Sequence, residues 1–305
     1  MMKTGTMVIL IAVIITVFLI TGCTQTQPVQ PTQQPTAVPI VTQADTVKTA
    51  STALGTIIVD PQGRTLYYFA NDVAANGTSA CNGQCAAIWP AFNATAVMVS
   101  TPLDPADFGS TTRADGTKQT TYYGWPLYYY SGDKNPGDMN GDKFLNIWYV
   151  IKPDESVLIS HRSDLGLFMI DTSGKTLYFF TKDTPGQSAC TGNCSTIWPP
   201  FSANPVTAPS LLGNGNFTQI TRPDGMNQTA FMGRPLYYYS RDAKPGDVNG
   251  QGFGNLWFVA NISGTVPVVT TNAPTTVPTS LPTTKRTTTA SDYNSGSSGG
   301  GGGGY

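Results

Sequence analysis

Charged residues are scarce in this sequence of 305 residues, at 11% of the chain, whereas soluble domains usually carry about a quarter. The 17 lysines and arginines nearly balance the 18 aspartates and glutamates, and no basic run stands out. Binding to the phosphates of nucleic acid needs a basic patch or stripe, so we expect no nucleic-acid partner. Low charge with many Thr, Gly, Pro and Tyr residues is typical of a secreted or cell-surface protein.

Histidine is also nearly absent, because the chain has only His161. A zinc site usually needs four converging Cys, His or carboxylate ligands, and His161 lies near no cysteine in the sequence. No second histidine and no Ser or Cys partner is in view for a catalytic triad. We therefore predict no catalytic residue and no cofactor from this side chain.

Long apolar runs are limited to residues 7–20, and these 14 residues are fewer than the roughly 20 that a membrane-spanning helix requires. The run follows Lys3 and ends in a small-residue segment just before Cys23, as in a lipoprotein export signal. We predict a signal peptide over 1–22 and lipidation of Cys23, which would anchor the chain on the extracytoplasmic face of the cell membrane. An uncleaved anchor helix is the alternative interpretation.

Two low-complexity arms flank the rest of the chain. Residues 23–50 are rich in Gln, Thr and Pro, and residues 263–305 are rich in Thr, Pro and Gly. Such segments cannot bury enough apolar surface to offset their ordering entropy, so we predict that both are disordered.

Between these arms one short motif occurs four times: a Tyr, an aromatic residue two positions later and an Asp five positions after the Tyr. A longer duplication surrounds it, since Trp198 follows Trp89 by 109 positions and Trp257 follows Trp148 by the same interval. Repeats of this kind indicate repeated structural units. We predict one repeat unit over 51–153 and a second over 154–262, each with two related halves. The motif residues are Tyr67, Phe69 and Asp72; Tyr128, Tyr130 and Asp133; Tyr178, Phe180 and Asp183; and Tyr237, Tyr239 and Asp242.

The residues around the motifs favour strands over helices. β-rich runs alternate with Pro-Gly and Asp-Gly turns, which predicts hairpins over 56–70 and over the segment that contains 114–116. We predict an all-β, mainly antiparallel fold in two tandem units, with little helix and one helical turn near 86–89. A four-bladed, propeller-like ring is the alternative, because four similar parts would suit it.

Period-two alternation places Tyr67 and Phe69 on one face of a strand and Tyr68 on the other. Asp72 then falls in the turn that ends this strand, where its carboxylate can accept backbone N–H bonds. Four equivalent acids favour an architectural role for the motif. A catalytic or metal-binding Asp is the alternative.

Four cysteines form two C-x-G-x-C pairs. In an exported protein such pairs favour disulfides, and the intervening Gly83 and Gly192 allow the positive φ that a small ring needs. A redox-active dithiol, a metal site or disulfides between the two units are alternatives. The paired residues are Cys81 with Cys85 and Cys190 with Cys194.

Asp138, Asn140 and Asp142 alternate as ligands do at the start of a calcium-binding loop. The glycine and the final glutamate of that pattern are out of place, because Gly141 comes too early and Tyr149 stands where the Glu belongs. We predict no bound metal or cofactor and keep Ca²⁺ as an alternative at these three residues.

The four Y-x-[FWY]-x-x-D motifs and the C-x-G-x-C-x-x-I-W-P elements resemble those of lipoproteins built from the secreted repeat of unknown function. The resemblance covers about 55–260. It implies an extracytoplasmic location and a repeat architecture, and the family brings no established activity.

We therefore expect a lipid-anchored surface protein with a non-catalytic binding or structural role at the envelope. Its expected partners are the membrane, through the lipid, and either envelope polysaccharide or surface proteins, on which Tyr129 and Tyr238 would stack if they are exposed. An extracytoplasmic enzyme that acts on glycans through Asp carboxylates is one alternative. A redox or metal-handling module that uses the cysteine pairs is the other.

Overall fold

The computed structural model describes residues 46–99 and 101–262, which contain both repeat units. The predicted signal peptide, Cys23 and the tail over 263–305 lie outside these residues. The first strand begins at Lys48, so the predicted linker boundary at residue 50 falls inside a strand. The unit starts earlier because the backbone amide of Thr46 already bonds the carbonyl of Met98, at 2.8 Å.

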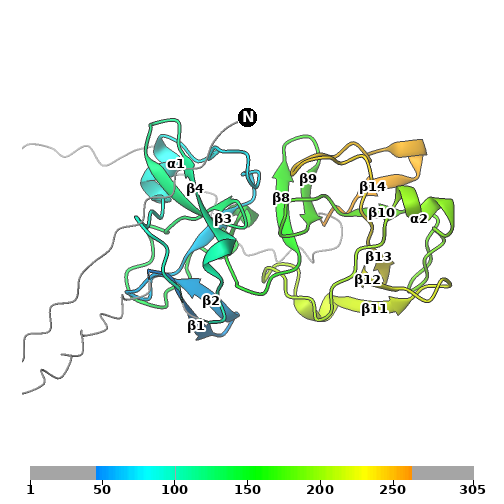
Figure 1. Ribbon diagram of the computed structural model, residues 1–305, viewed down its shortest axis with the longest axis horizontal. Helices are drawn as coiled ribbons and strands as arrows, with labels where there is room; N and C mark the ends of the chain where they lie inside the picture. The colour runs from blue at the N-terminus through cyan, green and yellow to red at the C-terminus, as the bar shows by residue number, and fades with distance from the viewer. Residues whose placement is uncertain (1–45, 100, 263–305) are drawn as a thin grey trace, which may run out of the picture. The chain divides into compact units, whose positions relative to one another are not determined.

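Each unit repeats one series of short antiparallel strands: a hairpin, a two-stranded sheet and a three-stranded sheet (Figure 1). In the first unit these are the hairpin β1 (Lys48–Thr52) and β2 (Gly55–Val59), the pair β3 (Tyr67–Phe69) and β7 (Trp148–Val150), and the sheet β4 (Phe108–Thr112), β5 (Lys118–Tyr122) and β6 (Trp125–Pro126). In the second they are β8 (Leu158–Arg162) and β9 (Gly166–Ile170), β10 (Tyr178–Phe180) and β14 (Trp257–Val259), and β11 (Phe217–Thr221), β12 (Asn227–Phe231) and β13 (Arg234–Pro235).

Helices are short but more numerous than the one turn that the sequence predicts near 86–89. They are α1 (Gln84–Ile88), α2 (Asn193–Ile197) and the 3-10 turns η1 (Pro105–Asp107), η2 (Phe144–Asn146), η3 (Asn214–Asn216) and η4 (Phe253–Asn255). The prediction of an all-β, antiparallel fold with four repeats is confirmed. Over 46–99 and 101–262 the strands form neither a closed barrel nor a propeller, because the sheets have only two or three strands each.

The predicted hairpin over 56–70 forms only next to its turn. The amide of Asp60 bonds the carbonyl of Arg64, Val59 and Thr65 form an antiparallel bridge, and the amide of Leu66 bonds the carbonyl of Ile58. The other edge of β2 pairs along its whole length with β1. Strand β3 pairs instead with β7, near the end of the unit. Both faces of β3 are fully buried, so the strand lies in the interior of the unit. The second predicted hairpin, β4 with β5, forms as expected.

The two faces of β3 enter different hydrophobic clusters, as the alternation predicts. Tyr67 and Phe69 pack with Trp89 and Trp148, whereas Tyr68 joins the other cluster. The rings of Trp89 and Trp148 are stacked at 3.8 Å between centroids and 1° between planes, and Phe69 continues the stack at 4.1 Å. The second unit repeats this stack with Phe180, Trp198 and Trp257 at the same separations.

The larger hydrophobic cluster contains residues from both units. Trp125 of the first unit is only 1% exposed, and its indole N–H donates to the carbonyl of Thr172 at 2.9 Å. The amide of Ile159 donates to the Tyr68 hydroxyl at 3.1 Å. Arg234 stands at the position of Trp125 in the second unit and is exposed, with its guanidinium 3.7 Å from the Phe179 ring centroid. One repeat position is therefore buried in the first unit and solvated in the second.

We expect Trp125→Arg to lower the free energy of unfolding by about 3 kcal/mol or more, because it removes a large buried ring and places a charge against the second unit. The control is Arg234→Ala at the equivalent position of the second unit. It removes an exposed side chain and should alter stability by about 0.5 kcal/mol or less. Urea unfolding followed by tryptophan fluorescence measures both. Equal losses in the two variants would contradict the assignment of Trp125 to the inter-unit contact.

Only a short segment links the two units, and it contains a buried carboxyl group. Glu155 is 7% exposed, and its Oε2 accepts the backbone N–H of Lys152 at 3.3 Å. Its other oxygen is buried and has no hydrogen-bond partner in the part of the chain that the structure describes. Burial raises the pKa of Glu155 from 4.5 to about 8, against the opposing charge of Lys152. Glu155 is therefore mainly protonated in the folded protein at neutral pH.

The raised pKa of Glu155 predicts a stability that falls as pH rises. The unfolded chain releases this proton above about pH 4.5 and the folded protein only near pH 8, so the free energy of unfolding decreases across that interval. Glu155→Gln removes the titration, and its stability relative to the parent should increase from pH 4.5 to pH 8. Denaturant titrations at both pH values measure this difference. A constant difference between variant and parent would refute the prediction.

Candidate functional site

The four Tyr-x4-Asp motifs bond to one another crosswise within each unit. Each tyrosine hydroxyl donates to the carboxylate of the other half-repeat and not to the Asp of its own motif. The donor–acceptor pairs are Tyr67 with Asp133 and Tyr128 with Asp72, both at 2.6 Å, Tyr178 with Asp242 at 2.7 Å, and Tyr237 with Asp183 at 2.8 Å.

A backbone bridge explains the exchange. The amide of Tyr67 bonds the carbonyl of Tyr128 at 2.9 Å, and the amide of Tyr128 bonds the carbonyl of Tyr67 at 3.0 Å. Two residues that exchange both bonds form an approximately twofold-symmetric antiparallel pair. Each ring therefore reaches across to the turn that follows its partner. Tyr178 and Tyr237 form the same bridge in the second unit, at 2.8 and 3.0 Å.

The carboxylates also bind the turns in which they lie. Asp72 accepts the amide N–H of Ala80 at 2.7 Å, and Asp133 accepts that of Asn140 at 2.9 Å. Asp183 and Asp242 do the same with Ala189 and Asn249. Each motif Asp thus closes its own turn and holds the tyrosine of the other half.

Burial governs the protonation of these groups. It raises the pKa of Asp72, which is 2% exposed, to about 6, while the Tyr128 hydroxyl, the Ala80 amide and Arg113 oppose the shift. It also raises the pKa of Asp133 and of the tyrosines that donate to these carboxylates. At neutral pH the tyrosines remain protonated donors, so they are poorly suited to act as general bases.

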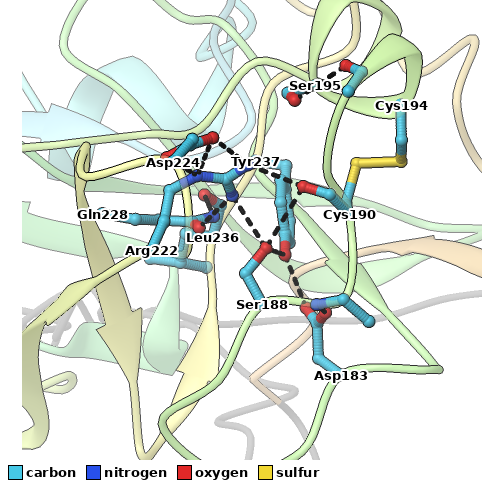
Figure 2. Close-up of a disulfide and its surroundings, with 12 residues drawn as sticks. Asp183, Ser188, Cys190, Cys194, Ser195, Arg222, Asp224, Gln228, Leu236 and Tyr237 are labelled. Atoms are coloured by element: carbon cyan, nitrogen blue, oxygen red, sulfur yellow. Dashed lines mark hydrogen bonds and ion pairs between the residues drawn. A yellow bond between two sulfur atoms is a disulfide. The ribbon is translucent and has the colours of Figure 1, made fainter.

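A buried arginine extends each bond network to the disulfide, as Figure 2 shows for the second unit. Arg222 Nη1 donates to Ser188 Oγ at 2.7 Å, and the Tyr237 hydroxyl lies 2.8 Å from that oxygen and from Asp183 Oδ2. Arg222 Nη2 donates to the carbonyl of Cys190 at 2.6 Å. Asp, Tyr, Ser and Arg therefore form one chain of contacts that ends on the disulfide loop.

The first unit has the same chain, formed by Arg113, Ser79 and Tyr128. The role of these arginines was not predicted from the sequence. A signal was present, because the element Arg-x-Asp-Gly-x-x-Gln occurs at 113–119 and again at 222–228. The Gln of this element accepts from the arginine at 2.6 Å in both units.

Both cysteine pairs are joined within their units, Cys81 to Cys85 and Cys190 to Cys194, with 5.2 Å between the Cα atoms. The alternative of disulfides between the two units is therefore wrong. Gly83 has the positive φ expected of it, at 57°. The loops so formed lead directly into α1 and α2.

The three candidate calcium ligands bond to different parts of the chain. Asp138 accepts two backbone amides of its own turn, Asn140 donates to Asp133, and Asp142 accepts the amide of Val150. Within 46–99 and 101–262 the structure contains no group of three His, Cys, Asp or Glu residues that could hold a metal ion. Calcium binding stays a sequence-based hypothesis.

One small hollow lies beside the second motif Asp of each unit, with volumes of about 210 and 250 Å³. Tyr129 and Tyr238, which were expected to be exposed, are half-buried in the walls of these hollows. Their hydroxyls donate to Asp60 and Asp171 at 2.9 and 3.0 Å. The two linings match residue for residue: Arg64, Thr65, Pro90, Tyr129, Tyr130, Ser131 and Asp133 in the first unit, and Lys175, Thr176, Pro199, Tyr238, Tyr239, Ser240 and Asp242 in the second.

Tandem all-β units with internally bonded Tyr and Asp side chains define a repeat protein. The chain belongs to the family described as the secreted repeat of unknown function, which matches it at 48–93, 109–152, 161–202 and 218–261. Each match contains one Tyr-x4-Asp motif. Membership in a family of secreted repeats indicates an extracellular location. No curated protein and no solved structure matches the chain significantly.

The part of the chain that the structure describes contains no helix of the length and apolarity that a membrane crossing requires.

We expect Tyr128→Phe to lower the free energy of unfolding by about 1–3 kcal/mol, because Asp72 and Ser79 stay buried and lose a partner. Tyr123→Phe is the matched control: the same atom is removed from a side chain that is 41% exposed, and the effect should be about 0.5 kcal/mol or less. Urea unfolding of both variants measures the difference. Similar losses in the two variants would contradict the importance of the crosswise bond.

Proposed function

We propose that the chain is exported, anchored through a lipid on Cys23, and binds polysaccharide of the cell envelope without chemically altering it. The observation that carries the proposal is the pair of equivalent hollows, one in each unit. Loops on a rigid scaffold are common places for binding residues, and both hollows are bordered by such loops.

The lining of each hollow suits a sugar ring. Tyr129 and Tyr130 offer aromatic surface, Ser131 offers a hydroxyl, and Asp133 offers a carboxylate. Arg64 lies over the Tyr129 ring, with its guanidinium carbon 4.0 Å from the centroid, and adds hydrogen-bond donors. The volumes are below the roughly 300–1,000 Å³ of pockets for drug-sized ligands, so each hollow fits about one sugar unit.

Two equivalent hollows in one chain favour a polymeric ligand. A polymer with a repeating unit can occupy both hollows at once, and the second contact is then intramolecular. The overall affinity for such a polymer exceeds that of either hollow alone. A lipid anchor would hold the module close to an envelope polymer.

The geometry gives less support to the glycan-cleaving alternative. Glycoside hydrolysis canonically needs two carboxyl groups on either side of the scissile bond. Each hollow has a single carboxylate in its lining, Asp133 or Asp242, and that group already accepts a tyrosine hydroxyl and a backbone amide. The redox alternative also has little structural support, because Cys81 and Cys190 are fully buried and are joined to Cys85 and Cys194 in disulfides.

Blocking the hollows tests the proposal. Ser131 and Ser240 are exposed at the rims, so Ser131→Arg and Ser240→Arg should fill the hollows without disturbing the core. We expect each single variant to bind immobilised envelope polysaccharide at least about tenfold more weakly, because avidity needs both sites. The double variant, in which both hollows are blocked, should lose measurable binding. Surface plasmon resonance gives the apparent Kd.

Asn135→Arg is the matched control, since it adds the same charge to an exposed turn outside the hollow. The second unit already has a basic residue, Lys244, at the equivalent position, so the fold accepts this change. The control should bind as the parent does. Retained binding in the double variant, or no binding by the parent, would refute the proposed function.

A further inference from the structure

A larger hollow, of about 500 Å³, lies on the first unit away from the paired hollows. It is bordered by the loop that follows Asp72, by η1 and the start of β4, and by the turn between β5 and β6. The amide of Ala75 bonds the carbonyl of Gly124 at 3.0 Å and fixes the loop against the turn. Its volume lies within the range of small-molecule sites, roughly 300–1,000 Å³.

Hydroxyl groups dominate the polar part of its lining. Thr78, Ser110, Thr111, Thr121 and Tyr123 contribute hydroxyls, and Asp107 contributes a carboxylate that accepts the Tyr123 hydroxyl at 3.0 Å. Neither lysine nor arginine is among the lining residues. This chemistry favours an uncharged ligand with many hydroxyl groups and disfavours an anion.

The two units have diverged at this place. The residues at the positions of Gly109, Thr111 and Thr121 in the second unit are Thr218, Ile220 and Ala230, and Asp107 is replaced by Asn216. The loop between the motif Asp and the buried Ser is also two residues shorter there, 184–187 against 73–78. The architecture that both units share therefore does not require the hydroxyls of the first unit.

The floor of the hollow has an unsatisfied hydroxyl and an unfilled position. Thr111 is 7% exposed, and its buried Oγ1 has no hydrogen-bond partner among residues 46–99 and 101–262. A buried hydroxyl without a partner is unfavourable, and rotation about χ1 exchanges its place with that of the methyl group. A Cβ added at Gly109 would lie 3.0 Å from the Thr121 hydroxyl, so the glycine keeps this part of the floor open.

We propose that this hollow is a binding site for a neutral saccharide, specific to the first unit. The hydroxyls and the Asp107 carboxylate would bond the sugar hydroxyls, and the Tyr123 ring would cover one face. This site uses none of the residues of the paired hollows, so it does not depend on the function proposed for them.

Saccharide-induced amide shifts in ¹⁵N-labelled protein test the proposal. The probes are neutral glucan, galactan and mannan oligosaccharides, with uronic-acid oligosaccharides of matched length as anionic controls. We expect a neutral probe to shift the amides of Gly77, Gly109 and Gly124, and the uronic-acid probes to leave them unchanged. Shifts from the anionic probes alone, or from none of the probes, would overturn the proposal.

The triple variant Gly109→Thr, Thr111→Ile, Thr121→Ala places the residues of the second unit in the first. We expect it to bind the neutral probe at least about tenfold more weakly, because the open floor and two hydroxyls are lost together. The same residues occur in β11 and β12, so the strands accept them. Thr78→Arg, on the exposed loop, blocks the hollow without touching the sheet and should have the same effect.

The double variant Ser131→Arg, Ser240→Arg separates this site from the paired hollows, because it should leave the shifts at Gly109 unchanged. Unchanged affinity in both the triple variant and Thr78→Arg would overturn the proposal. The last control is an extended Ser/Thr peptide, which could bind as an additional strand beside β4. If this peptide shifts the amides and the neutral saccharides do not, the proposal is overturned.

Discussion

The crosswise hydrogen bond between a tyrosine of one half-repeat and an aspartate of the other is the constraint on which the fold depends. It makes the half-repeat an incomplete structure, because Tyr67 finds its acceptor in Asp133 and Asp72 finds its donor in Tyr128. Two halves must therefore be present before either is satisfied. The four motifs of this chain form two closed pairs, which explains why they belong to two units and not to a ring of four equivalent blades.

The remaining interior is arranged around these bonds. The stacked Trp89 and Trp148 rings cover Tyr67 and Tyr128, and this apolar cover raises the pKa of the tyrosines by removing water from their hydroxyls. The charge of the buried Arg113 acts to lower the pKa of Asp72, and its Nη1 donates to Ser79. Tyr67, Tyr128, Asp72 and Arg113 thus have partners from distant parts of the chain, which ties the loops to the strands.

The sequence predicts the local features and misses the long-range ones. Period-two alternation correctly places Tyr67 and Tyr68 on opposite faces, because that property belongs to the strand alone. The pairing of β3 with β7 has no local signal, since the Pro-Gly turn after β2 predicts only the short hairpin that ends at Leu66. Trp125 and Arg234 occupy one repeat position, yet only the first contacts a neighbouring unit. Alignment of the two repeats cannot reveal that difference.

Comparison of the two repeat units shows which residues the shared fold requires and which it does not. Positions that maintain the fold, such as Tyr128 and Tyr237 or Arg113 and Arg222, keep both their chemistry and their bonds in the two units. Trp125 departs from its counterpart because it buries a surface against the second unit. Thr111 also departs from its counterpart, Ile220, but its hydroxyl bonds to nothing in the described residues. In the second unit an apolar residue fills this position, so the shared architecture does not require the hydroxyl, and the saccharide proposed for the first unit would supply its partner.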